Sequence, residues 1–443
     1  MHGKIASWAL GACLLLAGAT QVHAQAQAQP GITKDTILIG RSAGMTGAIA
    51  ARMKPATEAM NAYFESVNAA GGIHGRRLKL INLDDGNDAK RAVENTRKLI
   101  NEEKVFTLFS PSGTPQTAAV LPVATEAQVP LVSTTSGADS LRKPNKYFFH
   151  LKGSYGDEFA KIAEHLKTTG VTRVVVMHSD DPPGREGRQL AEAALEKQGL
   201  KAGAAISFKP GAVKESLAQM VKADPQAIIL PSVAGPGVEF YKEFVKLPNR
   251  PQVFTWSIMV VEGIYKEVGE KAYGLVVAQI VPSPNDKTFG VSRDYQELLR
   301  KAKLEDGGYS GMEGYISSRV LVEGLRRAGK EPTRDKLIAA LEGMRDFDLG
   351  GEVINFGPDH VGRRFVELTI VGKDGRCVRE ERGASRGPGR LGGPAAAPAR
   401  RAAVRQRRPF VPVFRTRVGA RRQGTTFNNI LRLPAVQGPG LGV

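Results

Sequence analysis

The strongest constraint on the fold is the regular alternation of short apolar runs with longer amphipathic stretches along most of the chain. Most runs are apolar without a break, as in strands covered on both faces, and intervening helices make consecutive strands parallel. The expected strands are 36–40, 78–83, 105–109, 131–133, 173–177, 227–230, 253–256, 275–280, 353–356 and 365–371. The expected helices are 55–69, 89–101, 115–127, 157–168, 186–198, 214–222, 293–303, 314–328 and 334–341. The pattern predicts an α/β fold of doubly wound parallel sheets, and 443 residues accommodate two of them.

The formal net charge of +18 is concentrated at the C-terminal end of the chain. Residues 377–443 contain 14 Arg, no Lys and two acidic residues, so the preceding body is only mildly basic. This distribution argues against a nucleic-acid-binding body. Arg, Gly, Ala and Pro, which G/C-rich codons specify, dominate residues 377–443 and indicate a frameshift read-through that forms a disordered tail. A disordered arginine-rich arm for RNA or anionic lipid is the alternative.

Residues 1–24 have the pattern of a cleavable secretory signal peptide. A weakly basic start with Lys4 precedes an apolar run over 5–19, and the small-x-small sequence at 22–24 predicts cleavage after Ala24. Cys13 lies inside the apolar run, which disfavours lipid anchoring at this residue. We therefore expect export to the periplasm, with no later segment apolar enough to span a membrane.

Motifs of common enzyme classes are missing from the sequence. It has no dinucleotide-binding glycine motif after a strand, no phosphate-binding loop, no nucleophile elbow and no metal-ligand spacing among its seven His. The sequence favours a binding protein with no catalytic residue, no cofactor and no metal. Two alternatives are a secreted α/β enzyme, which needs a nucleophile–base pair, and a sensory ligand-binding domain, which needs a membrane helix or kinase region in the chain.

Two polar loops follow expected strands, at 110–115 and 133–139. In the first, Thr114 is a good N-cap and Pro115 suits the first helical position. The free N–H groups at such a helix start favour an anion, typically a carboxylate. The second loop also leads into an expected helix start, so the two loops could clamp one carboxylate. Plain helix capping is the alternative interpretation.

The segment Asn-Ala-Ala-Gly-Gly-Ile-His-Gly-Arg-Arg at 68–77 resembles a helix–glycine turn–strand signature of periplasmic branched-chain amino-acid-binding proteins. These are the solute receptors of ABC transporters. Further similar segments follow in order, so that the resemblance runs from about residue 31 to 376; they are 83–85, 92–100, 135–139, 281–284 and 313–316.

The resemblance implies the type I periplasmic-binding fold, with two doubly wound lobes joined by a three-strand hinge. Lobe 1 is expected at 31–152 plus 282–349, and lobe 2 at 153–281 plus 350–376. A ligand in the cleft between them would stabilise the closed state, which the membrane permease recognises. The protein is expected to act as a monomer that binds a small molecule and no nucleic acid.

The resemblance also assigns ligand-binding positions. Two of these positions lie in the first polar loop and two in the second. Tyr155 would form an aromatic wall, and the remaining positions lie at the ends of strands or helices in lobe 2. The expected ligand-binding residues are Ser112, Thr114, Ser136, Gly137, Tyr155, Asp181, Ser232 and Ser257.

Two positions depart from the family pattern. Pro183 stands where the family often has an aromatic residue, and Ser257 stands near a Glu that would pair with the ligand's α-ammonium group. A buried ammonium without a partner costs several kcal/mol or more. Either Asp180 or Asp181 therefore substitutes for the Glu, or the ligand is a carboxylate without an amine. A branched-chain amino acid and a non-amino aromatic or aliphatic carboxylate both stay open.

Overall fold

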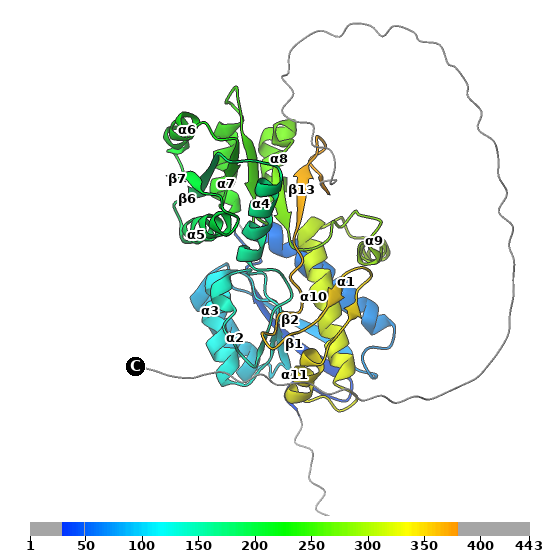
Figure 1. Cartoon of the computed structure of the whole chain (residues 1–443). Coiled ribbons are helices and arrows are strands. Elements are labelled where there is room, and N and C mark those ends of the chain that lie inside the picture. The colour runs from blue at the N-terminus through cyan, green and yellow to red at the C-terminus, as the bar shows by residue number, and fades with distance from the viewer. Residues whose placement is uncertain (1–28, 48, 380–443) are drawn as a thin grey trace, which may run out of the picture. The chain divides into compact units, whose positions relative to one another are not determined.

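The computed structural model describes residues 29–47 and 49–379, in two lobes that each contain a sheet (Figure 1). The predicted signal peptide, Cys13 and residues 380–443 lie outside the described residues. Lobe 1 contains a fully parallel sheet in the order β2-β1-β3-β4-β5. Its strands are β1 (Thr36–Ala43), β2 (Arg77–Asp84), β3 (Thr107–Phe109), β4 (Leu131–Val132) and β5 (Phe148–Phe149).

Helices cover both faces of this sheet, as the continuous apolar runs predict. Alternate side chains of β1 explain how: Ile37 and Ile39 are buried in one core cluster, while Leu38 packs against the other. The first face carries α1 (Ala50–Ala69), α9 (Gly290–Ala302), α10 (Gly308–Arg327) and α11 (Arg334–Glu342). The second face carries α2 (Ala89–Asn101) and α3 (Thr114–Glu126), followed by the short 3-10 helix η1 (Asp139–Leu141) (Figure 1).

Lobe 2 contains a seven-stranded sheet in the order β14-β13-β10-β9-β8-β6-β7. The strands from β6 to β10 pair in parallel, and the last two are antiparallel. The strands are β6 (Val174–Ser179), β7 (Ala202–Phe208), β8 (Ala227–Ile229), β9 (Gln252–Thr255), β10 (Val276–Gln279), β13 (Glu367–Val371) and β14 (Cys377–Arg379). The helices are α4 (Tyr155–Thr168), α5 (Pro182–Lys197), α6 (Val213–Lys222), α7 (Ala234–Phe244), α8 (Val261–Val268) and the 3-10 helix η2 (Gly269–Ala272).

The chain passes between the lobes three times, after β5, after β10 and before β13. The third passage lies later than the sequence predicted. The hairpin of β11 (Phe347–Asp348) and β12 (Val353–Ile354) precedes it, and Ile354 and Phe356 are buried in the lobe 1 core. The Phe356 ring lies 5.4 Å from that of Phe149, edge to face. Residues 350–356 therefore belong to lobe 1 and not to lobe 2, because their apolar side chains complete its core.

The expected start of the tail at residue 377 is also wrong. Cys377 to Arg379 form β14, which pairs antiparallel with β13 through Val371↔Cys377 and Thr369↔Arg379. A tight turn makes this hairpin possible: the Gly372 N–H donates to the Arg376 carbonyl at 2.8 Å, and Gly375 adopts a φ of 79°. The folded body therefore extends at least to Arg379.

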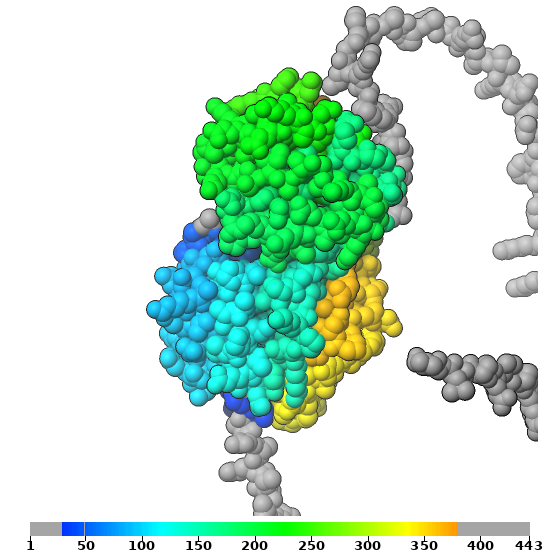
Figure 2. Space-filling view, turned by 60° about the vertical axis from the view of Figure 1, so that its left-hand side comes forward, coloured from blue at the N-terminus to red at the C-terminus, as the bar shows by residue number. Residues whose placement is uncertain are grey.

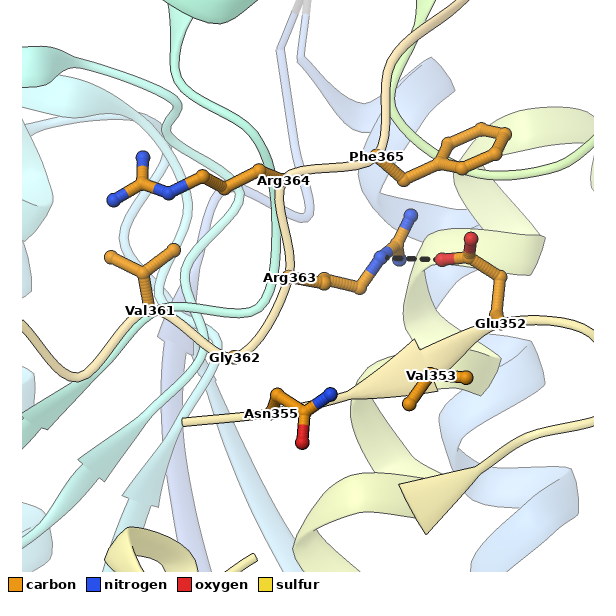
Figure 3. Close-up of a pocket in the computed structure, with 8 residues that line it drawn as sticks. All are labelled: Glu352, Val353, Asn355, Val361, Gly362, Arg363, Arg364 and Phe365. Atoms are coloured by element: carbon orange, nitrogen blue, oxygen red, sulfur yellow. Dashed lines mark ion pairs between the residues drawn. The ribbon is translucent and has the colours of Figure 1, made fainter. Parts of the chain in front are cut away.

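A cavity of about 370 Å³ lies along the third passage (Figure 3). The side chain of Arg363 points across it to Glu352, with Nε 2.8 Å from Oε2, and both side chains are buried. Arg363 also donates to the Ile280 carbonyl. The lining residues are Glu352, Val353, Asn355, Val361, Gly362, Arg363, Arg364 and Phe365, so none of the predicted ligand-binding residues lines this cavity.

Candidate ligand-binding site

The two predicted loops leave β3 and β4 at the same edge of the lobe 1 sheet, because these strands are parallel neighbours. Each loop begins with a serine in the left-handed region, Ser110 with a φ of 47° and Ser133 with a φ of 66°. This conformation is uncommon for residues other than glycine and costs on the order of 1–3 kcal/mol. Such strain is concentrated at ligand-binding and catalytic sites, so it marks this edge as a candidate site.

The loops are joined by direct hydrogen bonds. The Gly113 N–H donates to Thr135 Oγ1 at 3.1 Å, and the Thr135 N–H donates to the Pro111 carbonyl at 3.1 Å. The hydroxyls of Thr114 and Ser136 are 2.7 Å apart. The clamp hypothesis requires Thr114 and Ser136 to be close together, and the structure brings them into contact; their binding of a ligand stays a prediction.

The helix starts differ from the sequence expectation. Gly113, with a φ of 78°, is the N-cap of α3, and Thr114 is the first helical residue. Thr117 donates its N–H to the Gly113 carbonyl at 3.1 Å, so the preceding N–H groups have no acceptor within the helix. The second loop leads only into the three-residue η1. The helix-dipole contribution to anion binding therefore comes from α3 and not from two helices.

A buried cation lies beneath the first loop. Arg41 of β1 donates from Nε to the Ser110 carbonyl at 2.9 Å and from Nη1 to Thr57 Oγ1 at 2.6 Å. Among residues 29–47 and 49–379, no carboxylate forms an ion pair with Arg41. Burial lowers the pKa of Arg41 to about 10, so its guanidinium is charged at neutral pH. Ser112 is fully buried beside it and accepts the Gly44 N–H at 2.9 Å. This arrangement favours negative charge at the first loop.

Tyr155 is the first residue of α4 and lies against the second loop. Its N–H donates to the Gly137 carbonyl at 2.8 Å, and its ring packs so closely that a Cβ on Gly137 would lie 2.8 Å from it. The Trp256 ring follows at 4.8 Å between centroids. A capping box of Ser154 and Asp157 fixes the start of α4. Tyr155 and Trp256 thus provide an aromatic wall beside Gly137.

The predicted serines of lobe 2 hold other side chains in place. The Ser232 carbonyl accepts Trp256 Nε1–H at 2.7 Å, and the Ser232 hydroxyl donates to the Val233 carbonyl at 3.2 Å. Ser257 donates its N–H to Glu158 Oε2 at 2.6 Å and its hydroxyl to Oε1 at 2.9 Å. Through Trp256 and Glu158, both serines are connected to the N-terminal turn of α4 and so to Tyr155.

Asp181 lies at the start of α5 in lobe 2. It is the N-cap of α5 and accepts the Gly184 N–H at 2.7 Å. The neighbouring Asp180 forms ion pairs with Arg185 at 2.8 Å and Lys209 at 3.3 Å. Within the described part of the chain, no hydrogen bond or ion pair joins either carboxylate to the two loops. Both acids have partners at the start of α5, and their binding of a ligand stays a prediction.

The sequence analysis missed a set of buried charges, Arg52, Lys152, Glu158 and Glu313, which we name the interlobe charge cluster. Glu313 of α10 accepts Arg52 Nη2 at 2.9 Å and Lys152 Nζ at 2.9 Å. Lys152 also donates to the Thr135 carbonyl at 2.6 Å. Arg52 Nη1 lies 3.4 Å from the Ser257 carbonyl. The cluster thus connects α1 and α10 of lobe 1 with the loop after β9 in lobe 2. Figure 2 shows the surfaces of the two lobes in contact, with the green residues of lobe 2 above the blue and cyan residues of lobe 1.

The pKa values of the two carboxyl groups in the cluster are shifted in opposite directions. Burial raises the pKa of Glu158 to about 7, although the Ser257 amide and Lys152 act in the other direction. Burial also disfavours ionised Glu313, but the charges of Lys152 and Arg52 prevail and lower its pKa. Glu313 is therefore the ionised partner of the two cations, and Glu158 is partly protonated at neutral pH.

A sequence signal for this cluster exists. Arg52 shares the buried face of α1 with Ala56 and Ala59, at the helical spacing of four and seven residues. Glu158 lies on the buried face of α4, which also carries Tyr155. Charged residues are almost never fully buried unless they are paired, so a charge on the apolar face of a helix indicates a buried partner.

Comparisons with known proteins agree with this architecture. The family model for periplasmic binding proteins matches residues 36–376. The chain is similar to an amino acid binding protein of Pseudomonas aeruginosa, with 24% identity over 169 residues that cover 37% of this chain and 45% of that protein. It is also similar to Leu/Ile/Val-binding protein homolog 3 of Brucella melitensis, with 27% identity over 180 residues that cover 40% and 48%. The chain thus spans about half the length of these curated relatives.

Solved structures are similar over most of the chain. An extracellular ligand-binding receptor from Verminephrobacter eiseniae has a TM-score of 0.72 at 27% identity, covering 77% of this chain and 99% of that one. A branched chain amino acid ABC transporter protein from Thermus thermophilus with bound valine has a TM-score of 0.70 at 19% identity, covering 79% and 96%. The second likeness shows the fold alone. The predicted type I periplasmic-binding fold is confirmed.

Proposed function

Because this chain belongs to the family of periplasmic binding proteins, we propose that it captures a small carboxylated ligand and delivers it unchanged to the permease of an ABC transporter. The observation that carries this proposal is the 2.7 Å contact of Thr114 and Ser136 at the start of α3, above the buried Arg41. Hydroxyls, free N–H groups and a buried cation there all favour a carboxylate. The ligand stabilises a closed arrangement of the lobes, and the protein acts as a monomer.

Two classes of ligand fit this proposal. The names of the relatives suggest a branched-chain amino acid, whose carboxylate would lie at Thr114 and Ser136 and whose side chain would lie against Tyr155 and Trp256. A non-amino aromatic or aliphatic carboxylate would use the same loops and the same aromatic wall.

The proposed location is the periplasm, reached through cleavage of the signal peptide after Ala24. The family supports this location. None of the helices formed by residues 29–47 and 49–379 has the length and apolar character of a membrane span.

We propose that the protein has no catalytic activity. Ser257 Oγ and Glu158 Oε1 are 2.9 Å apart, which is the distance that a nucleophile–base pair requires. However, Glu158 also accepts the Ser257 N–H and is fully buried, so this carboxyl holds the loop after β9 in place. The described residues contain no group of three or more His, Cys, Asp or Glu side chains that could hold a metal ion.

The proposal is tested with the full-length chain by thermal shift and isothermal titration against a panel of small carboxylates that includes leucine, valine, 4-methylpentanoate and 3-phenylpropanoate. We expect at least one member to raise the melting temperature. Ser136→Ala should weaken its binding at least tenfold. Ser140→Ala, four residues away at an exposed position of η1, is the matched control and should bind as the wild type does. A panel without any binder would contradict the proposed function.

A further inference from the structure

The interlobe charge cluster contacts the residue that precedes Ser136 in the proposed carboxylate site. Lys152 Nζ donates to the carbonyl of Thr135, the neighbour of Ser136, at 2.6 Å. Arg52 lies beyond Lys152, on the other side of Glu313. In an α-amino acid, the ammonium group is bonded to the carbon next to the carboxylate. An amino acid held at Thr114 and Ser136 would therefore place its ammonium beside this cluster.

The two carboxylates of the cluster and the neighbouring Asp139 already have partners. Both oxygens of Glu158 accept from Ser257, at 2.6 and 2.9 Å. One oxygen of Glu313 accepts from Arg52 and the other from Lys152, each at 2.9 Å. Asp139, at the start of η1, accepts the Gly156 N–H at 2.9 Å. The ligand's ammonium would thus compete with two cations for Glu313, and with a backbone amide for each of the others. Burial and the charge of Asp139 raise the pKa of Glu186 of α5, which favours the neutral form of Glu186.

The cations of this region are buried as deeply as the carboxylates. Lys152 is 2% exposed and Arg52 8% exposed, and Arg41 beneath the first loop forms no direct ion pair among the described residues, although the charges of Asp85 and Glu313 stabilise its guanidinium. A second ammonium here would be desolvated beside positive charge, which is strongly unfavourable. A ligand that brings only a carboxylate instead adds the negative charge that these cations favour.

We propose that the ligand carries a carboxylate but no α-ammonium group, and that Arg52 is the residue that excludes amino acids from the site. This inference rests on the proposed function and narrows its ligand to one chemical class. Arg52 is suited to this role because its Nη1 lies 3.4 Å from the Ser257 carbonyl. This carbonyl is an acceptor that the ligand's ammonium would otherwise use.

The first test compares matched pairs that differ only in the amino group, with the full-length chain. The pairs are L-leucine with 4-methylpentanoate and L-phenylalanine with 3-phenylpropanoate, measured by thermal shift and by isothermal titration. For each pair in which a compound binds, we expect the acid without the amino group to bind at least tenfold more tightly than the amino acid. An amino acid that binds more tightly than its deaminated partner overturns this inference and leaves the proposed function standing. If none of these four compounds binds, and no member of the wider carboxylate panel binds, both this inference and the proposed function are overturned.

The second test changes the proposed specificity residue. Arg52→Gln removes the cation and frees an oxygen of Glu313, so the preference for the deaminated acid should fall at least tenfold. Arg52→Lys keeps the charge and should keep the preference. Arg188→Gln, in the half-exposed Arg188–Glu192 pair of α5, is the control and should not change this preference. An unchanged preference in Arg52→Gln overturns the role of Arg52. If Arg52→Gln does not fold, the matched pairs measured with the wild type still test the ligand class. A loss of the preference in Arg52→Lys would still contradict the role of the charge at this position.

Discussion

Gly137 joins the second loop to the aromatic wall, and it can do so only without a side chain. A Cβ at this position would lie 2.8 Å from two ring atoms of Tyr155, a distance that real Cβ contacts do not show. We expect Gly137→Val to displace the Tyr155 ring and to weaken ligand binding at least tenfold, measured by isothermal titration. Gly235→Ala in α7, where a Cβ meets open space, is the control. Wild-type affinity in Gly137→Val would show that the Tyr155–Gly137 contact does not form part of the site.

Glu158 predicts a pH dependence of stability. Burial raises its pKa from 4.5 to about 7, so the folded chain binds this proton more tightly than the unfolded chain does. The resulting stabilisation is complete below pH 4.5 and is lost as the pH rises through 7. In Glu158→Gln, we expect the fall in unfolding free energy between pH 5 and 8 to be smaller than in the wild type, by up to about 3 kcal/mol. Urea unfolding at both pH values measures it, and an equal fall in both proteins would contradict the prediction.

Sequence reasoning predicted that the two polar loops lie close together, because the signals for this are local. Loops rich in Ser, Thr and Gly after strands predicted the neighbourhood of Thr114 and Ser136, because parallel strands end at one edge of a sheet. It missed the interlobe charge cluster, whose partners Arg52 and Glu313 are 261 residues apart. A charge on an apolar helix face indicates that a partner exists, but only the packed structure shows which one.

At the scale of the elements, the third passage between the lobes depends on one buried ion pair. The side chains of Arg363 and Glu352 are 2% and 8% exposed. Glu352→Gln leaves a buried guanidinium without a counter-charge, and we expect it to lower the unfolding free energy by about 3–5 kcal/mol. Glu352→Leu combined with Arg363→Met should cost less than either single change, since no lone charge remains. A double-mutant cycle in urea measures the coupling, and additive losses would contradict it.

The start of α4 is a second element with a testable role. Its capping box holds the turn that presents Tyr155 and Glu158. Removal of the cap in Ser154→Ala should cost about 1 kcal/mol of unfolding free energy and also weaken ligand binding. Thr168→Ala at the exposed end of the same helix is the control and should leave binding unchanged. A loss of stability without any loss of affinity would separate the cap from the site.

The elements that sequence reasoning missed share a physical reason. Edge strand β7 alternates buried and exposed residues over much of its length, so it has no continuous apolar run. Helix α7 begins with Ala-Gly-Pro-Gly, a sequence typical of loops. Strand β12 was predicted within 353–356, but its place in lobe 1 was not, because Ile354 and Phe356 fill the lobe 1 core through long-range packing that leaves no local pattern.

At the scale of the whole molecule, the lobes are joined by buried polar contacts as well as by the three passages. Arg52 reaches Ser257 across the boundary, and the Tyr155 N–H donates to Gly137. A ligand at 100 times its Kd adds about 2.7 kcal/mol to the stability of the form that binds it. We therefore expect saturating ligand to raise the melting temperature by several degrees. In Ser136→Ala, a tenfold weaker affinity reduces the stabilisation at the same ligand concentration to about 1.4 kcal/mol, so the shift should fall to about half or less, and an undiminished shift would contradict the site.

The position of Trp256 gives this protein a built-in optical probe. The sequence contains two tryptophans, and the other, Trp8, lies in the segment that we predict to be cleaved. The indole of Trp256 is fully buried, donates a hydrogen bond to the Ser232 carbonyl and packs against the Tyr155 ring at a tilt of 52°. Arrival of a ligand beside this ring changes its polarity and its quenching by neighbours. The fluorescence of the mature chain should therefore report occupancy of a single site, without any attached dye.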